Sequence, residues 1–340
     1  MLSCTKAGEE ATDGADAENR AEGLLTQWVE RQLGARVRSI VRQNRWRPAW
    51  FVEIDGSNGP SALYVRGERT IKSVSFPLEH EYRVLTVLEA NGIRVPHIHG
   101  MCPDPFSIVM EKAPGRADLS TANDDVERRA VMDDYIAQLA AMHSIDIAAL
   151  EAAGFKRPRG SAETALTLFE EFVALYRGQK CQPEPLLEFF ISWVRRNVPK
   201  HRDRVALVCA DPAQFLFDEG RVTALIDFEL AHLGDPLHDV AGLLLRDMSE
   251  PLGDIGRALR RYVDLTGEEI DEAAFDFHFI QWAACRPIAM SVNLSKPHPT
   301  GDMVQYFEWS THVGRVTLEV IARCAGVELS ARSSPPAPSA

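Results

Sequence analysis

Residues 205–229 read Val205-Ala-Leu-Val-Cys-Ala-Asp-Pro-Ala-Gln-Phe-Leu-Phe-Asp-Glu-Gly-Arg-Val-Thr-Ala-Leu-Ile-Asp-Phe-Glu229. The segment begins with an apolar run and continues with two more, at 215–217 and 222–226, which predict short buried strands. Asp218-Glu219-Gly220 separates the last two runs and is typical of a hairpin turn. The stretch therefore predicts a small β-hairpin with polar side chains just outside both of its strands.

Three polar side chains are expected to meet at the open end of this hairpin. Residues equally far from a hairpin turn face each other, which places Gln214 near Asp227, and Asp211 is three residues before Gln214. Carboxylate and amide oxygens suit Mg²⁺, and a further carboxylate can accept the proton of a hydroxyl nucleophile. Either aspartate alone is typical of a turn or a cap, but their convergence favours phosphoryl transfer.

The chain resembles the aminoglycoside phosphotransferase / choline kinase family in Arg221-Val-Thr-Ala-Leu-Ile-Asp-Phe-Glu-Leu-Ala-His-Leu-Gly-Asp-Pro-Leu-His-Asp-Val240. It looks especially similar to bacterial phosphotransferases related to the kinase domains that are fused to acyl-CoA dehydrogenases. The resemblance implies an α+β, two-lobed protein-kinase-like fold with a small antiparallel-sheet N-lobe and a larger, mainly helical C-lobe. It also implies a kinase that uses ATP or GTP with Mg²⁺ to phosphorylate a small-molecule hydroxyl.

The resemblance implies a role for each polar residue of the hairpin. Asp211 matches the catalytic-loop aspartate, and Asp227 and Gln214 match the two metal ligands, although the family has Asn where Gln214 stands. The family's loop usually reads His-Gly-Asp, four residues, then Asn. Here Cys209 and Ala210 replace the first two residues, and the loop is two residues shorter. A nucleotide-binding pseudokinase with a regulatory role therefore stays open beside an active enzyme.

The nucleotide site is implied by the resemblance alone. Arg66 takes the position of the third-strand lysine, and Glu81 is expected to pair with it from the following helix. Met110, Glu111 and Lys112 match the interlobe linker, which contacts the purine through its backbone. Without the resemblance, Arg66 and Glu81 would be taken as ordinary surface charges.

Four segments are expected along the chain. They are a flexible acidic leader at 1–20, a nucleotide-binding N-lobe with its linker at 21–113, a helical C-lobe with the catalytic hairpin at 114–331, and a disordered tail at 332–340. The N-lobe is expected to contain a helix at 24–33, strands at 50–55, 62–66, 95–98 and 106–110, and a helix at 78–91.

Other polar groups of the chain are ambiguous. Asp235 before Pro236 predicts a helix N-cap, and Asp239 is expected to be structural. Glu229 lies either near the metal or against the loop. The basic loop with Arg42, Arg45 and Arg47 can cover nucleotide phosphates, bind an anionic substrate group, or simply be solvated.

Composition limits the class of protein. The chain has 340 residues, of which 45% are hydrophobic and 25% charged, which is typical of a globular protein. A net charge of −12 disfavours nucleic acid as a partner, and no apolar run reaches the roughly 20 residues of a membrane span. The absence of CxxC pairs and of an apolar leader predicts a cytoplasmic protein. The expected partners are a nucleotide and a small-molecule acceptor, either a hydroxyacyl-CoA or an aminoglycoside-like alcohol.

Overall fold

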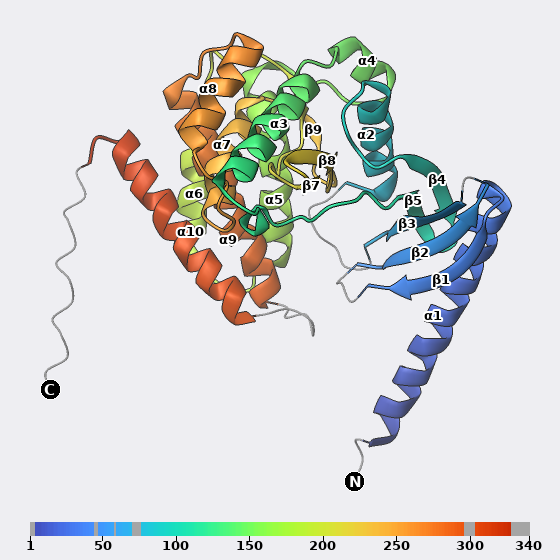
Figure 1. Ribbon diagram of the computed structural model, residues 1–340. Coiled ribbons are helices and arrows are strands. Elements are labelled where there is room, and N and C mark those ends of the chain that lie inside the picture. The colour runs from blue at the N-terminus through green and yellow to red at the C-terminus, as the bar shows by residue number, and fades with distance from the viewer. Residues whose placement is uncertain (1–3, 44–46, 58, 70–75, 296–302, 328–340) are drawn as a thin grey trace, which may run out of the picture.

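The computed structural model describes residues 4–43, 47–57, 59–69, 76–295 and 303–327. A small sheet with two helices forms one lobe, and a larger group of helices forms the other (Figure 1). The expectation of a two-lobed kinase-like α+β fold is confirmed. None of the helices in the described part of the chain is long and apolar enough to cross a bilayer.

The N-lobe contains one antiparallel sheet with the strand order β1-β2-β3-β5-β4. Its strands are β1 (Arg36–Arg42), β2 (Ala49–Gly56), β3 (Gly59–Gly67), β4 (Ile98–Pro103) and β5 (Phe106–Glu111). The turn between β2 and β3 contains Gly59, whose φ of +101° is easily adopted only by glycine. The register pairs Trp50 with Val65, so the strand predicted at 50–55 meets the one predicted at 62–66.

Two N-lobe predictions need correction, and one strand was not predicted. The expected strand at 95–98 begins only at Ile98, since Pro96 has no N–H to offer a sheet. Strand β1 was not predicted, because its polar residues leave no clean alternation and most of its side chains are partly or fully exposed. Helix α1 (Cys4–Leu33) begins well before the expected residue 24, inside the segment predicted to be a flexible leader. That segment contains many Ala and Glu residues, which favour helix.

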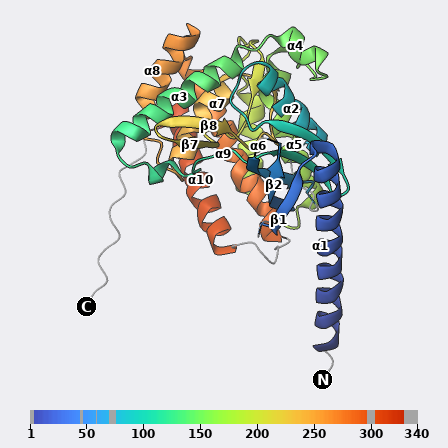
Figure 2. The same cartoon turned by 45° about the vertical axis from the view of Figure 1, so that its right-hand side comes forward.

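Helix α1 lies along the sheet with its C-terminal part and projects past the sheet at its N-terminal end (Figures 1 and 2). Leu25, Trp28 and Val29 are buried in a core that also contains Val52 and Val65 of the sheet. Helix α2 (Leu78–Ala90), close to the predicted 78–91, contacts β4 and β5 and belongs to the core of the C-lobe. Because α2 joins that core, it connects the two lobes.

The C-lobe consists mostly of helices. They are α3 (Asp125–His143), α4 (Ile147–Ala152), α5 (Gly160–Gln179), α6 (Pro185–Arg196), α7 (Leu237–Asp247), α8 (Ile255–Thr266), α9 (Glu272–Ser295), α10 (Met303–Cys324) and the short 3₁₀ helix η1 (Leu119–Thr121). Helix α9 contacts α5, α6, α7 and α10, and its Trp282 is almost fully buried with an edge-on contact to Phe172. This central helix supports the site described below.

Two small strand pairs lie among these helices, close to the N-lobe (Figure 1). Strand β6 (Ala206–Val208) pairs with β9 (His232–Gly234), a strand that was not predicted. Strand β7 (Phe215–Asp218) pairs with β8 (Arg221–Leu225), which is the predicted hairpin.

The chain that leaves the sheet after β5 attaches to this hairpin. Arg116 and Phe217 exchange both of their backbone hydrogen bonds, at 3.0 Å each, and the Thr223 hydroxyl donates to the Pro114 carbonyl at 2.6 Å. Gly115 has φ +106°, and a Cβ on it would lie 2.5 Å from the Phe217 carbonyl oxygen. Only glycine therefore fits at position 115, and its small size lets the linker lie directly against the hairpin.

Candidate active site

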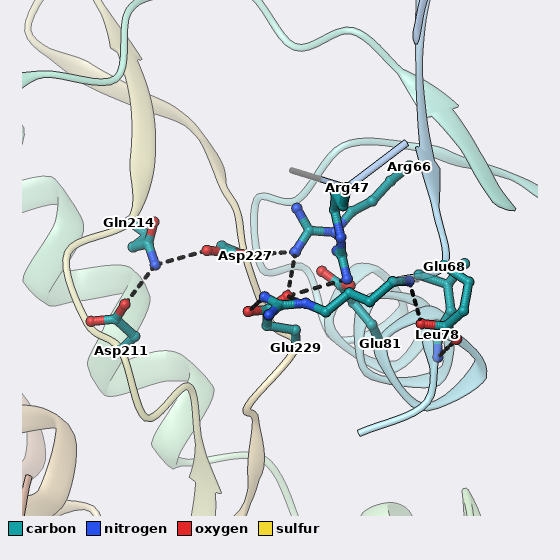
Figure 3. A network of polar contacts seen from close by, with 10 residues as sticks. Arg47, Arg66, Glu68, Leu78, Glu81, Asp211, Gln214, Asp227 and Glu229 are labelled. Carbon is teal, nitrogen blue, oxygen red and sulfur yellow. Dashed lines mark hydrogen bonds and ion pairs between the residues drawn. The ribbon is translucent and has the colours of Figure 1, made fainter. Parts of the chain in front are cut away.

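The three polar residues predicted at the open end of the hairpin are in contact with one another. The Gln214 amide nitrogen donates to Asp211 Oδ2 and to Asp227 Oδ2, at 2.9 Å each (Figure 3). The Ile226 N–H donates to the Gln214 carbonyl at 3.0 Å, which extends the β7–β8 ladder to the end of the hairpin. The register argument thus placed these side chains correctly.

The backbone around these residues is strained. Ala210, Ala213 and Asp227 have φ values of 67°, 60° and 67°, in the left-handed region that residues other than glycine rarely adopt. Asp tolerates this region better than most residues, whereas alanine does so at a cost. Ala210 and Ala213 lie on either side of Asp211-Pro212, so the strained positions flank the aspartate that matches the catalytic residue.

Asp239, at the start of α7, holds the loop in this conformation. Its Oδ2 accepts from the Cys209 N–H at 2.8 Å and its Oδ1 accepts from the Ala210 N–H at 2.8 Å. The Cys209 thiol and His143 Nε2 also lie within hydrogen-bond distance of Oδ2, at 3.2 and 3.1 Å. Burial opposes ionisation of Asp239, but the contacts with His143, His238 and the Cys209 N–H together outweigh it and lower the pKa of Asp239.

The replacement of the family's histidine by Cys209 is therefore accommodated. Burial and the nearby Asp239 raise the pKa of the Cys209 thiol, so it stays protonated and can donate. An imidazole is still present, supplied by His143 of α3. The Tyr135 hydroxyl accepts from the Ala213 N–H at 2.7 Å and holds the other side of the loop.

Asp235 is structural as well. Its Oδ1 accepts from the Leu237 N–H at 3.0 Å, which satisfies one of the free donors at the start of α7. Arg202 donates to both of its carboxylate oxygens, at 2.6 and 2.8 Å, and lowers the pKa of Asp235 against the opposing effect of burial. Pro236 lies at the N-cap rather than at the first helical position that was predicted.

Arg66 connects the N-lobe to the hairpin. Its Nε donates to Glu81 Oε2 at 2.9 Å, so the predicted pair between β3 and α2 is present. Its Nη2 hydrogen-bonds Asp227 Oδ1 and also donates to Glu229 Oε2 at 3.1 Å (Figure 3). Burial favours the neutral carboxyl, but the charges of Arg66 and Arg47 and the hydrogen bonds from Arg66 and Gln214 together outweigh it and lower the pKa of Asp227. Glu229, whose role was ambiguous, belongs to this network.

Two further arginines complete the network. Arg47 is buried, and its guanidinium lies 3.5 Å from Glu81 and 3.3 Å from Glu229. Arg69 Nε donates to Glu229 Oε2 at 3.1 Å. Three guanidinium groups and three carboxylates thus meet at the junction of the lobes, where a ligand with several negative charges could exchange with the carboxylates.

The other arginines of the predicted basic loop lie elsewhere. Arg42 pairs with Glu18 of α1 at 3.1 Å, and Arg45 is outside the described residues. Of the alternatives for this loop, simple solvation is wrong for the buried Arg47.

The predicted linker residues lie at the end of β5. Met110 is buried and pairs with Tyr64 in the sheet. The Glu111 N–H donates to the His97 carbonyl at 2.8 Å, and the Lys112 N–H donates to the Ala62 carbonyl at 2.9 Å. Both N–H groups are already hydrogen-bonded within the protein. A purine would therefore hydrogen-bond to the carbonyl oxygens of this stretch.

Two arginines of the site were not predicted to contact Asp211. Arg286 Nη2 of α9 donates to Asp211 Oδ1 at 2.7 Å, and Arg246 Nη2 of α7 lies 2.9 Å from the same oxygen. They are 75 and 35 residues from Asp211 in the chain. Only the packing of α7 and α9 brings them there, and no local spacing signals it.

The donor set at the hairpin fits Mg²⁺. Asp227 and Gln214 offer a carboxylate and an amide oxygen, and Mg²⁺ needs few protein ligands beside water and phosphate. Across the described chain, no group of three or more His, Cys, Asp or Glu side chains is placed to hold a metal. To bind the ion, Asp227 would give up its hydrogen bond from the Gln214 amide nitrogen, and the Gln214 side chain would present its amide oxygen instead.

Comparison with known proteins gives the family. The model of the phosphotransferase enzyme family matches residues 50–288. Mouse acyl-CoA dehydrogenase family member 10 is 28% identical over 207 residues, which are 57% of this chain and 19% of that protein. Human acyl-CoA dehydrogenase family member 11 is 27% identical over 179 residues, 48% of this chain and 22% of that protein. The chain thus spans about a fifth of the length of these two relatives.

Solved structures share the fold. A putative aminoglycoside phosphotransferase from Ralstonia eutropha has a TM-score of 0.69 at 17% identity, over 89% of this chain and 98% of that one. An ethanolamine kinase from Plasmodium vivax has a TM-score of 0.59 at 12% identity, over 84% and 83% of the two chains. A mutant aminoglycoside phosphotransferase in a ternary complex with ADP and hygromycin B has a TM-score of 0.59 at 14% identity, over 87% and 98%. The chain belongs to the phosphotransferase enzyme family, as its resemblance at 221–240 predicted.

Proposed function

We propose that this protein is a Mg²⁺-dependent kinase that transfers the terminal phosphoryl group of ATP or GTP to a hydroxyl of a small molecule. The observation that carries the proposal is the hydrogen-bonded set of Asp211, Gln214 and Asp227, joined to Arg66 of the other lobe. Two oxygen-bearing metal ligands, a separate carboxylate and a cation at one point are what phosphoryl transfer requires. A structural neighbour in complex with ADP and another with AMP-PNP support a nucleotide donor.

Each residue has one task in this reaction. Asp211 accepts the hydroxyl proton while the hydroxyl oxygen bonds to the terminal phosphorus. The bond from that phosphorus to the bridging oxygen breaks, and the nucleoside diphosphate leaves with its electron pair. Arg66 contacts the phosphate oxygens of the nucleotide, positioned by Glu81. Asp227 and Gln214 would hold Mg²⁺, which supplies neutralisation of phosphate charge when bound.

The acceptor is the finer part of the proposal. The two relatives are named as acyl-CoA dehydrogenase family members, which makes a hydroxyacyl-CoA the first acceptor to test. The structural neighbour with hygromycin B makes an aminoglycoside the second.

A pseudokinase is the second candidate function. Cys209 in place of the family's histidine and the shortened loop favour it. It predicts nucleotide binding without transfer to any acceptor. Against it, Asp239 and Tyr135 hold the loop so that the Asp211 side chain reaches the hairpin.

The decisive experiment measures ADP or GDP release with and without acceptors for the wild type, Asp211→Asn and Asp218→Asn. Asp218 is an exposed residue at the end of β7, next to the turn of the same hairpin, and serves as the matched control. Loss of the general base is expected to lower turnover about 10²- to 10⁴-fold, with nucleotide binding retained. The Asp218 variant should equal the wild type. Full turnover in Asp211→Asn would refute the assigned role, and binding without turnover in every protein would favour the pseudokinase.

A further inference from the structure

The two oxygens of the Asp211 carboxylate face different partners. Oδ2 accepts from Gln214 and so faces the proposed metal ligands. Oδ1 meets two guanidinium groups, Arg286 at 2.7 Å and Arg246 at 2.9 Å. The side of Asp211 away from the metal ligands is therefore lined by two positive charges.

Both arginines are held in place by the core of the C-lobe. Arg246 Nε donates to the Pro212 carbonyl at 3.2 Å, within the catalytic loop itself. Arg286 lies over the ring of the buried Trp282, with 4.2 Å from its Cζ to the ring centroid. Stacking and a backbone hydrogen bond restrict both side chains, so they are preorganised rather than mobile surface groups.

The charges at this point do not balance. Arg246 and Arg286 contribute +2 and Asp211 contributes −1, so the group carries a net +1 among these three side chains. The side chains are only 20% and 27% exposed. Arg246 Nη2 is buried and makes no hydrogen bond to any residue that the structure describes, despite its short distance to Asp211. An incompletely paired, poorly solvated cation is costly, and a second anion would satisfy it.

We propose that the acceptor carries an oxyanion, a phosphate or a carboxylate, next to the hydroxyl that is phosphorylated, and that Arg246 and Arg286 bind it. This inference rests on the proposed function, because it assigns the acceptor of the same site. The hydroxyl must come within about 3 Å of Asp211, and the arginines contact the same carboxylate. The oxyanion then lies within roughly 6 Å of the hydroxyl, which indicates a small hydroxy acid or an alcohol phosphate in place of the hydroxyacyl-CoA, whose carboxyl group is a neutral thioester.

This local charge opposes what the whole chain suggests. A net charge of −12 would attract a cationic acceptor such as an aminoglycoside. A cationic amine beside Arg246 and Arg286 would be repelled by two like charges at close range. This repulsion outweighs the attraction by the net charge of the chain, because most of that charge is distant and screened. The structure therefore favours an anionic acceptor over an aminoglycoside-like one.

The first test measures anion binding without requiring turnover. Inorganic phosphate is titrated against the wild type, Arg286→Gln, Arg246→Gln and the control Arg315→Gln, with Mg²⁺ and AMP-PNP at saturation, and the melting temperature is followed. Arg315 forms an exposed pair with Glu319 on α10 and lies outside the site. Phosphate should raise the melting temperature of the wild type and the control, and its apparent affinity should fall at least tenfold in Arg286→Gln. Arg286→Lys, which keeps the charge, should recover part of the effect.

The second test separates the kinds of oxyanion. ADP release is compared for matched acceptors, glycerol 3-phosphate against glycerol and a hydroxy acid against its amide. The anionic member of at least one pair should have a kcat/KM at least tenfold higher in the wild type, and Arg286→Gln should remove that preference. The pair that shows the preference tells whether the group is a phosphate or a carboxylate.

The outcomes keep this inference apart from the proposed function. A phosphate effect that is absent in the wild type, or equal in the wild type and both site variants, would overturn the anionic acceptor even if the enzyme is active. Preference for the neutral acceptors would do the same. A protein that binds phosphate through Arg286 but shows no Mg²⁺-nucleotide binding would instead refute the kinase and leave the anion site standing.

Discussion

Asp239 holds the catalytic loop, and its replacement by asparagine tests that interpretation. The carboxylate is fully buried and accepts two backbone N–H donors on separate oxygens, from Cys209 and Ala210, at 2.8 Å each. His143 approaches one of these oxygens at 3.1 Å. An asparagine has the same shape but only one accepting oxygen, so its NH₂ group must face at least one N–H donor.

The expected cost follows from these contacts. Hydrogen bonds to an ionised group contribute about 1.5–3 kcal/mol each, and breaking a buried charged network costs about 3–5 kcal/mol. We take about 4 kcal/mol for Asp239→Asn. At about 2.1 cal/mol/K per residue, a chain of 340 residues has an unfolding entropy of about 0.7 kcal/mol/K. The melting temperature should therefore fall by about 6 °C.

The measurement is thermal unfolding by circular dichroism at pH 7.5, paired with a turnover assay. The control is Asp125→Asn, whose side chain is 76% exposed and pairs with Arg128 in the next turn of α3. Its melting temperature should stay within about 1 °C of the wild type. An Asp239→Asn protein that melts within 1 °C of the wild type would show that Asp239 does not hold the loop.

Variants at three further positions are informative. Arg66→Met leaves the buried Glu81 without its 2.9 Å partner and should abolish nucleotide-dependent stabilisation, whereas Arg66→Lys keeps the charge and should retain part of it in the same melting assay. His232 is buried beside His238, and burial, then that neighbour, lowers its pKa from 6.5 to about 4. The unfolded chain binds this proton first, so stability should fall by about 3 kcal/mol as the pH drops from 6.5 to 4, and urea unfolding of His232→Gln should show a flatter pH profile. Gly242→Ala places a Cβ 2.7 Å from the Pro212 ring and should cost about 1–3 kcal/mol and reduce turnover.

Each of these three has a clear contrary result. Equal nucleotide-dependent shifts for Met and Lys at position 66 would refute a role for the cation. An unchanged pH profile in His232→Gln would show that other groups cause the loss of folding stability at low pH. For Gly242, the control is Gly178→Ala on α5, where a Cβ meets nothing within 4 Å and should stabilise the helix slightly. A gain of stability in both glycine variants would contradict the close packing of α7 on the loop.

The hairpin shows what sequence can predict. A turn motif between two short apolar runs determined the register, and the register placed Gln214 and Asp227 face to face. The family resemblance added the position of Arg66, whose bond to Glu81 spans 15 residues and could not be derived from spacing.

What was missed depends on tertiary packing. Arg246 and Arg286 reach Asp211 only because α7 and α9 pack on the catalytic loop, and no spacing in the sequence indicates either contact. His143 is 96 residues from Asp239, so the sequence did not indicate that it supplies the imidazole missing at Cys209. The edge strand β1 lacked alternation, because most of its side chains remain partly or fully exposed.

The central claim is that Asp227 contributes to a Mg²⁺-nucleotide site, and thermal stability with ATP or GTP tests it most directly. The comparison is between the wild type and Asp227→Asn, because asparagine tolerates the left-handed φ of 67° at this position. At a nucleotide concentration 100-fold above Kd, the wild type should gain about 2.7 kcal/mol. That gain raises the melting temperature by about 4 °C with Mg²⁺ present, and by much less without it. The account predicts that Asp227→Asn loses the Mg²⁺-dependent part of the shift, and a shift of the same size in both proteins would contradict it.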